Sequence, residues 1–291
     1  MNKLPPGFAG TAAGPLTQTI DARWLMAYAA ALGATEPVHL DTARTGGLLA
    51  HPLFPVCYEW PAVLELRAAL PSEVAGRGVH ATHDLVVHRL PRAGDRLTTT
   101  AVVTALCPHR AGALVTTRLE TVDADGQPVS TTEYGSIYRD VACEPAETAA
   151  VPLAVPPRIP VSAGPRWTAT VPVPAGLAHV YSECARIWNP IHTDPAVARA
   201  AGLPNVILHG TATLGLAVTE VVRREAAGDP ARVRRITGRF GAMVGLPSTL
   251  TVDGLGVVEV AGGTGVAFRV VTVDGRPAVR DGRVLLATRP I

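Results

Sequence analysis

The residues between positions 181 and 211 carry the clearest chemistry in the sequence. Residues 181–192 read Tyr-Ser-Glu-Cys-Ala-Arg-Ile-Trp-Asn-Pro-Ile-His, and an Asp-Pro pair follows at 194–195. This pattern predicts a helix, a tight Asn-Pro turn, a histidine just past the turn and a new helix start. A further helix of small residues is predicted to begin at His209-Gly210. An imidazole near a helix N-terminus suits work on an acyl carbonyl, which needs a proton-transfer group and a donor for a developing oxyanion.

This stretch resembles the signature of the MaoC-like (R)-specific enoyl-CoA hydratases, a branch of the hotdog-fold superfamily. The signature reads Asp-x-Asn-Pro-x-His and, further along the chain, an apolar Ile/Val-x-His-Gly. The sequence departs from it at one position, because Ile187 stands where the family has its catalytic aspartate. Half of the family's acid–base pair is therefore missing. The positions that match are Asn189, Pro190, His192, Ile207, His209 and Gly210.

The resemblance implies roles for three of these residues. His192 would be the acid or base, since an imidazole titrates near neutrality; the alternative is a buried histidine that only bonds backbone in the turn. Gly210 would stabilise the thioester oxygen through its N–H at the positive end of the helix dipole. Its glycine could instead serve only to fit the helix end against the sheet. Asn189 would orient a water or cap the turn.

A second group of residues is predicted to bind substrate: Ile187, Trp188, His209 and Thr211. Trp188 is suited to an apolar wall of the pocket and equally to the core, and His209 could merely satisfy a backbone carbonyl. Because an alkyl side chain cannot transfer a proton, a relocated acid is a possibility. Glu183 lies one turn before Ile187 on the same predicted helix face, although an exposed surface glutamate is the alternative.

The chain repeats itself weakly around a proline-rich segment. Asp-Gly turns at 125–126 and 274–275 lie 149 residues apart, which suggests duplication. We predict an N-terminal half at 1–139 without the motif, a linker at 140–166 and a C-terminal half at 167–291. In the first half His51-Pro52 mirrors His209-Gly210, but proline lacks the N–H that an oxyanion hole would use.

Each half is interpreted as helices followed by strands. The helix at 210–225 is apolar nearly all round, which is typical of a buried helix. We predict an α+β fold in which two antiparallel sheets each wrap one long helix, and the resemblance names this arrangement a double hotdog. The other helices are expected near 21–32, 58–69, 174–185 and 195–201, and the strands near 79–90, 96–106, 112–123, 128–138, 232–244, 248–259, 265–273 and 276–288.

Composition limits the class of protein. Hydrophobic residues make up 47% and charged residues 17%, as in a compact globular chain, and a net charge of +2 gives no nucleic-acid footprint. No apolar run of about 18 residues is present to span a membrane. The N-terminus does not resemble a signal peptide and the four cysteines are scattered, so we expect a cytoplasmic protein with reduced thiols.

Other motifs give no metal or cofactor site. His80, His83 and His88 share one predicted strand, where strict alternation would put His83 on the face opposite the other two. The glycine-rich run at 262–265 lies between strands, so it is no phosphate loop. We expect neither a metal nor a cofactor.

The sequence thus favours a hydratase or dehydratase acting on an acyl-CoA or an acyl-carrier-protein thioester. The alternative is a hydratase-like scaffold that has acquired a different function, either as a cyclase of secondary metabolism or as a non-catalytic acyl-binding subunit. A homodimer is expected from general frequencies, although two hotdog units in one chain also permit a monomer.

Overall fold

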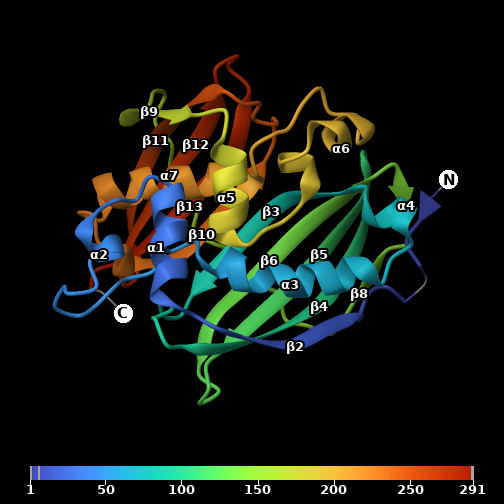
Figure 1. Ribbon diagram of the computed structural model, residues 1–291, viewed down its shortest axis with the longest axis horizontal. Coiled ribbons are helices and arrows are strands. Elements are labelled where there is room, and N and C mark those ends of the chain that lie inside the picture. The colour runs from blue at the N-terminus through green and yellow to red at the C-terminus, as the bar shows by residue number, and fades with distance from the viewer. Residues whose placement is uncertain (1, 6, 290–291) are drawn as a thin grey trace.

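The frame of the molecule is one antiparallel sheet that runs through both halves of the chain (Figure 1). The computed structural model describes residues 2–5 and 7–289. The strand order is β2-β4-β5-β6-β3-β10-β13-β12-β11-β9, with the short β8 (Ala146–Glu147) beside β4. A separate two-residue parallel pair joins β1 (Asn2–Lys3) to β7 (Val141–Ala142). The two halves therefore meet edge to edge at the centre of the sheet, where β3 pairs with β10.

The strands are long and almost symmetrically arranged about that central pair. In the first half they are β2 (Ala12–Thr19), β3 (Gly78–Val87), β4 (Arg96–His109), β5 (Gly112–Val122) and β6 (Pro128–Arg139). In the second half they are β9 (Trp167–Val173), β10 (Val233–Phe240), β11 (Ser248–Val260), β12 (Gly263–Thr272) and β13 (Pro277–Ala287). An ion pair joins the halves, with Arg235 on β10 donating twice to Asp84 on β3 at 2.7 Å.

The helices lie against this sheet (Figure 1), and the two longest occupy equivalent places. Helix α3 (Pro55–Ala68) packs on β2, β4 and β5, and α7 (Gly210–Glu225) packs on β10 to β13. The fold class predicted from the sequence, an antiparallel sheet around one long helix in each half, is confirmed. The shorter helices are α1 (Ala22–Ala31), α2 (Pro37–Leu40), α4 (Ser72–Ala75), α5 (Leu177–Ala185) and α6 (Pro195–Ala200), with 3-10 turns η1 (Pro190–His192) and η2 (Pro230–Arg232).

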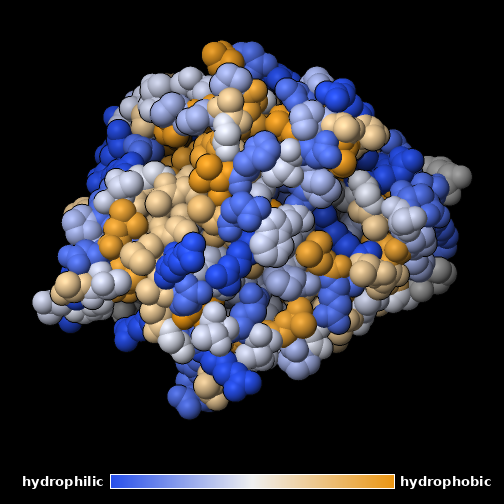
Figure 2. Space-filling model, in the orientation of Figure 1, coloured by the Kyte–Doolittle hydropathy of each residue, from blue (hydrophilic) through white to orange (hydrophobic). Residues whose placement is uncertain are grey.

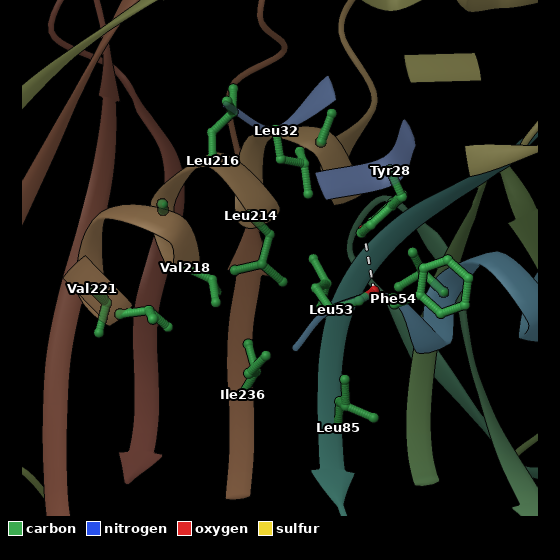
Figure 3. Close-up of a cluster of buried hydrophobic side chains, with 14 of the residues drawn as sticks. Tyr28, Leu32, Leu53, Phe54, Leu85, Leu214, Leu216, Val218, Val221 and Ile236 are labelled. Atoms are coloured by element: carbon green, nitrogen blue, oxygen red, sulfur yellow. Dashed lines mark hydrogen bonds between the residues drawn. The ribbon is translucent and has the colours of Figure 1, made fainter. Parts of the chain in front are cut away.

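One large apolar cluster contains residues of both halves and joins them (Figure 3). Tyr28 of α1 and Leu32 at its C-terminal cap belong to one cluster with Leu214 of α7, and Leu85 of β3 lies beside Ile236 of β10. All five side chains are at most 1% exposed. A Cβ on Gly215 would come within 2.7 Å of Leu32, so the small residue lets α1 approach α7 closely. Burial of this area supplies the main stabilisation of the interface between the halves.

Each half begins with an edge strand, which corrects the prediction of helices first. Strand β2 contains Gly14-Pro15, a pair that reads as a turn in the sequence, and β9 directly follows the proline-rich segment. Both strands are held by pairing with a distant partner, β2 with β4 and β9 with β11. Such long-range pairing overrides the local turn signal. Helix α3 also begins earlier than expected, because Pro55 is accommodated in its first turn.

The proline-rich segment crosses from the first half, where β8 pairs with β4, to the second. Beyond β7 and β8 it has no regular structure until β9. Its backbone is nevertheless tied to β11, since the Ser162 amide donates to Leu255 at 3.0 Å and the Arg166 amide to Gly254 at 2.7 Å.

On the face drawn in Figure 2, apolar side chains gather in a band over the α1 and α7 region, and hydrophilic side chains cover much of the remainder. Within residues 2–5 and 7–289, none of the helices combines the length and the apolar character required for a membrane span.

Candidate active site

A cavity of about 330 Å³ lies where the two halves meet. The first half contributes residues of α3 and β3 to its wall, and the second half contributes the Asn-Pro-Ile-His turn and the start of α7. The sequence-predicted residues Ile187, Asn189, His192, His209, Gly210 and Thr211 all line it. Residues separated by many positions in the sequence are thus brought to one cavity.

The His192 side chain is held in a defined orientation by the backbone. Its Nδ1 lies 2.8 Å from the carbonyl oxygen of Ile207. A carbonyl oxygen only accepts, so Nδ1 carries the proton and Nε2 keeps its lone pair. Among the described residues nothing hydrogen-bonds to Nε2. Burial lowers the pKa of His192 to about 4, so the imidazole is neutral at pH 7.

A second imidazole packs flat on the first. The His209 ring stacks on His192 with centroids 3.6 Å apart, and its Nε2 lies 3.2 Å from the Ser182 hydroxyl. Burial, followed by the neighbouring His192, lowers the pKa of His209 well below its ordinary range. Two neutral rings therefore form one wall of the cavity, and His209 limits the rotation of His192.

The N-terminus of α7 opens on the same cavity through Gly210 and Thr211. The first amides of this sixteen-residue helix have no partner within the helix, as in any α-helix. No side chain caps this end either, so these amides are available to a ligand. The Tyr181 hydroxyl donates to Thr211 Oγ1 at 3.0 Å. A Cβ on Gly210 would lie 3.2 Å from the Phe240 ring, so space here is limited.

Ile187 and Asn189 complete the second half's contribution. Ile187 is 5% exposed and belongs to the shared core, so an alkyl wall fills the position where the family has aspartate. Asn189 precedes the turn η1 but its side chain makes no capping hydrogen bond. The capping role that we considered for Asn189 is therefore not seen, and its amide is left for the cavity.

Two residues considered from the sequence do not reach the site. Trp188 does not line the cavity and is 60% exposed, because the chain turns outward between Ile187 and Asn189. The structure thus does not bring Trp188 to the cavity where the other predicted residues lie. Glu183 is also exposed and lies outside the lining, as a surface position on α5 would be. The idea of Glu183 as a relocated acid is not supported.

The sequence reading missed the polar contribution of the first half. Glu59, Trp60 and Arg67 of α3 line the cavity together with His80 and His83 of β3. A register shift between His80 and Thr82 breaks the strand alternation, and the His80 and His83 rings lie 5.4 Å apart. Our expectation of opposite faces for these two histidines was therefore wrong. A charged residue inside the apolar run Val-Cys-Tyr-Glu-Trp was the signal available for Glu59.

Glu59 is a deeply buried carboxyl. It is 3% exposed, and its Oε1 accepts from the hydroxyls of Ser130 at 3.1 Å and Thr132 at 2.8 Å. Burial raises its pKa to about 7, against the lowering effect of the two hydroxyls. Near neutrality this carboxyl is therefore present in both its neutral and its ionised form.

The equivalent position in the first half is arranged for packing. His51 lies outside this cavity, with Nδ1 accepting from the Leu53 amide at 3.1 Å and Nε2 lying 3.1 Å from the Thr219 hydroxyl. Both nitrogens are thus used within the protein. In the part of the chain that the structure describes, no group of three or more histidine, cysteine or acidic side chains is placed to hold a metal ion.

Comparison with known proteins identifies relatives of both parts of the chain. Residues 168–274 match the family model for the MaoC like domain, and residues 7–132 match that for the FAS1-like dehydratase domain region. The chain thus contains a MaoC-like domain at 168–274. It is 42% identical over 66 residues to the peroxisomal enoyl-CoA hydratase 2 of Arabidopsis thaliana, a match covering 23% of this chain and 21% of that protein. The chain thus corresponds to about a fifth of that relative's length.

Solved structures show the same fold over nearly the whole chain. A MaoC-like dehydratase from Phytophthora capsici superposes with a TM-score of 0.81 at 23% identity, covering 96% of this chain and 97% of that one. A Mycobacterium tuberculosis protein described as having a double hotdog fold superposes with a TM-score of 0.62 at 19% identity, covering 97% and 98%. The fold is a double hotdog.

Proposed function

We propose that the protein adds water to, or removes it from, an acyl thioester linked to CoA or to a carrier protein, with His192 as the acid–base group. The observation that carries this is the fixed tautomer of His192, whose Nδ1–H bonds the Ile207 carbonyl and leaves Nε2 as a base beside the uncapped start of α7. The match of residues 168–274 to the MaoC like domain and the enoyl-CoA hydratase named among the relatives support the same reaction class.

In the hydration direction, Nε2 of His192 takes a proton from water as the water oxygen bonds to Cβ of the enoyl thioester. The π electrons of the double bond move towards the thioester carbonyl, and the negative oxygen is stabilised by the Gly210 N–H and the helix dipole. The imidazolium then returns the proton to Cα. We assign the water to Asn189, whose side chain forms no capping hydrogen bond in the turn and lines the cavity. Dehydration is the reverse sequence.

A second candidate function rests on Ile187. Because an alkyl group replaces the family's aspartate, His192 alone must both accept and donate the proton. A scaffold that lacks the second acid–base residue can instead serve as a cyclase or as a non-catalytic acyl-binding subunit. Incubation with crotonyl-CoA, following the loss of the enoyl absorbance, separates the candidates. Turnover above the uncatalysed rate supports the hydratase, and binding without turnover supports the alternative.

A further inference from the structure

Two buried polar side chains of the first half face the cavity and are not used by the reaction proposed above. They are Glu59 on α3 and His83 on β3, at 3% and 2% exposure. Both nitrogens of His83 lack a hydrogen-bond partner, and among the described residues Glu59 Oε2 forms no hydrogen bond either. Buried polar groups in proteins are nearly always hydrogen-bonded, because each one left unpaired costs about 1–3 kcal/mol. The unpaired His83 nitrogens, with the free Glu59 Oε2 on the same cavity, point to a ligand.

The register of the sheet places these two groups over one face. Thr132, which donates to Glu59, is paired with Leu85, and His83 is paired with Tyr134 two residues further along β6. Positions two apart in a strand share one face, so His83 and Thr132 both belong to the inner face of the β3–β6 ladder. The Glu59 carboxyl, which accepts from Thr132, therefore lies over the same face of the ladder as the His83 ring although the two residues come from different elements.

Glu59 and His83 are polar residues beside an apolar part of the cavity wall. The neighbouring wall is formed by Val56, Val63 and Leu119, all buried. A plain hydrocarbon chain would be accommodated best by a fully apolar wall, and it would leave both polar groups unpaired. Two further cavity residues of α3 also have unpaired buried donors, the indole N–H of Trp60 and Nε of Arg67.

The chemistry of the pair defines the ligand group. A neutral imidazole offers one donor and one acceptor, and a carboxyl that is partly protonated near neutrality offers either. Together they complement an uncharged oxygen. A carboxylate on the ligand would be repelled whenever Glu59 is ionised.

We propose that Glu59 and His83 form a polar subsite that selects acyl thioesters with a hydroxyl or keto oxygen on the acyl chain beyond the reacting carbons. This inference deepens the proposed function and rests on it, since it assumes that the acyl chain enters this cavity. The substrates it indicates are oxygenated acyl thioesters, in contrast to simple alkyl ones.

Binding of unreactive thioesters tests the subsite independently of catalysis. We would measure by calorimetry the Kd of hexanoyl, 5-hydroxyhexanoyl and 5-oxohexanoyl thioesters, each as its CoA and its pantetheine derivative. The expected result is about tenfold or greater preference for an oxygenated chain, the scale of one or two buried hydrogen bonds. Equal or tighter binding of hexanoyl, or no binding of any thioester, would overturn the proposal.

Variants assign the preference to the residues. His83→Leu is the cleaner change, because no protein group loses a partner, and it should abolish the preference. Glu59→Leu should do the same, although it strands the Ser130 and Thr132 hydroxyls. The matched controls are His88→Leu and Glu65→Leu, exposed residues beside β3 and on α3 that lie outside the cavity, and both should keep it. A preference retained in His83→Leu contradicts the subsite.

Turnover separates this inference from the function on which it rests. Hex-2-enoyl-CoA and 5-hydroxyhex-2-enoyl-CoA would be compared under the same conditions. Selective binding without hydration of either leaves the subsite standing and removes the proposed reaction. Hydration of both with equal kcat/KM retains the reaction and removes the subsite.

Discussion

The imidazole rings of His192 and His209 stack at 26° with their centroids 3.6 Å apart. Each ring is anchored at its far side, His192 by the Ile207 carbonyl and His209 by the Ser182 hydroxyl. The stack therefore holds the unpaired Nε2 of His192 in one place beside the first residue of α7. Fixing a base in this way reduces the entropy that must be lost on the way to the transition state.

Removing the imidazole should abolish most of the activity. We expect His192→Ala to lower kcat for hydration of crotonyl-CoA by about a hundredfold or more, the usual scale for a positioned acid–base group. Circular dichroism would verify that the variant is folded. His179→Ala is the matched control, since His179 is exposed and bonds only the Thr193 carbonyl, and it should keep normal turnover. Normal turnover in folded His192→Ala would show that the histidine is structural.

The pH profile should report the lowered pKa of His192. A base works in its neutral form, so kcat/KM should stay level from neutral pH downward and fall only as the pH drops through about 4. An acid limb near 6.5, the ordinary value, would mean that burial does not control this group. Enzyme held at each pH and then assayed at pH 7.5 must recover fully, so that unfolding is not mistaken for titration.

Two substitutions of Gly210 separate the effect of its N–H on the oxyanion from the steric effect of an added Cβ. Gly210→Ala keeps the amide and adds only the Cβ that meets the Phe240 ring at 3.2 Å. Gly210→Pro adds comparable bulk at Cβ and also deletes the N–H, at a helix position where proline is tolerated. We expect the proline variant to be about 10²–10³-fold slower than the alanine variant. Equal rates for the two folded variants would exclude the Gly210 amide.

The alkyl side chain at position 187 can be exchanged for the family's acid. We expect Ile187→Asp to raise the hydration rate for crotonyl-CoA, because it restores a second proton-transfer group beside His192. The same change places a carboxylate among core side chains, so the melting temperature should fall. Ile187→Asn is the matched variant, with similar polarity and size but no acid. A gain in rate with Asn as large as with Asp would contradict the acid–base explanation.

Stability should respond to pH in opposite directions through His83 and Glu59. Burial lowers the pKa of His83 to about 4, so the unfolded chain binds its proton first and the native state is destabilised as the pH falls from 6.5 to 4. Burial raises the pKa of Glu59 to about 7, so the native state is destabilised as the pH rises from 4.5 to 7. Over its full pH range, each group should change the free energy of unfolding by roughly 3 kcal/mol.

Urea unfolding of variants between pH 4 and 8 measures these contributions. The unfolding free energy of His83→Leu should fall less than that of the wild type as the pH is lowered from 6.5 to 4. The unfolding free energy of Glu59→Gln should fall less than that of the wild type as the pH is raised from 4.5 to 7. Each variant is compared with the wild type at every pH, so the difference in unfolding free energy isolates one group. Parallel curves for the variant and the wild type would show that the group does not titrate differently on folding.

The sequence by itself determined the local parts of the site. The turn before His192, the helix start at Gly210 and the absence of an acid at Ile187 are all properties of a few adjacent residues. The full length of α7 was also predictable, because a helix of small and apolar residues is buried on almost every side. These features depend on short-range propensities and on hydrophobic patterning, and both can be recognised directly in the amino-acid sequence.

Only the tertiary structure decided what faces those residues across the cavity. Pairing of β3 with β10 sets His83 opposite Gly238, 155 positions away, and thereby brings the polar side chains of the first half to the motif of the second. The register shift after His80 turned that ring to the same side as His83, against the alternation expected of a regular strand. The placing of Glu59 likewise depends on the packing of α3 on the sheet. Strand partners, register shifts and helix docking are settled by packing over the whole molecule, and no local pattern encodes them.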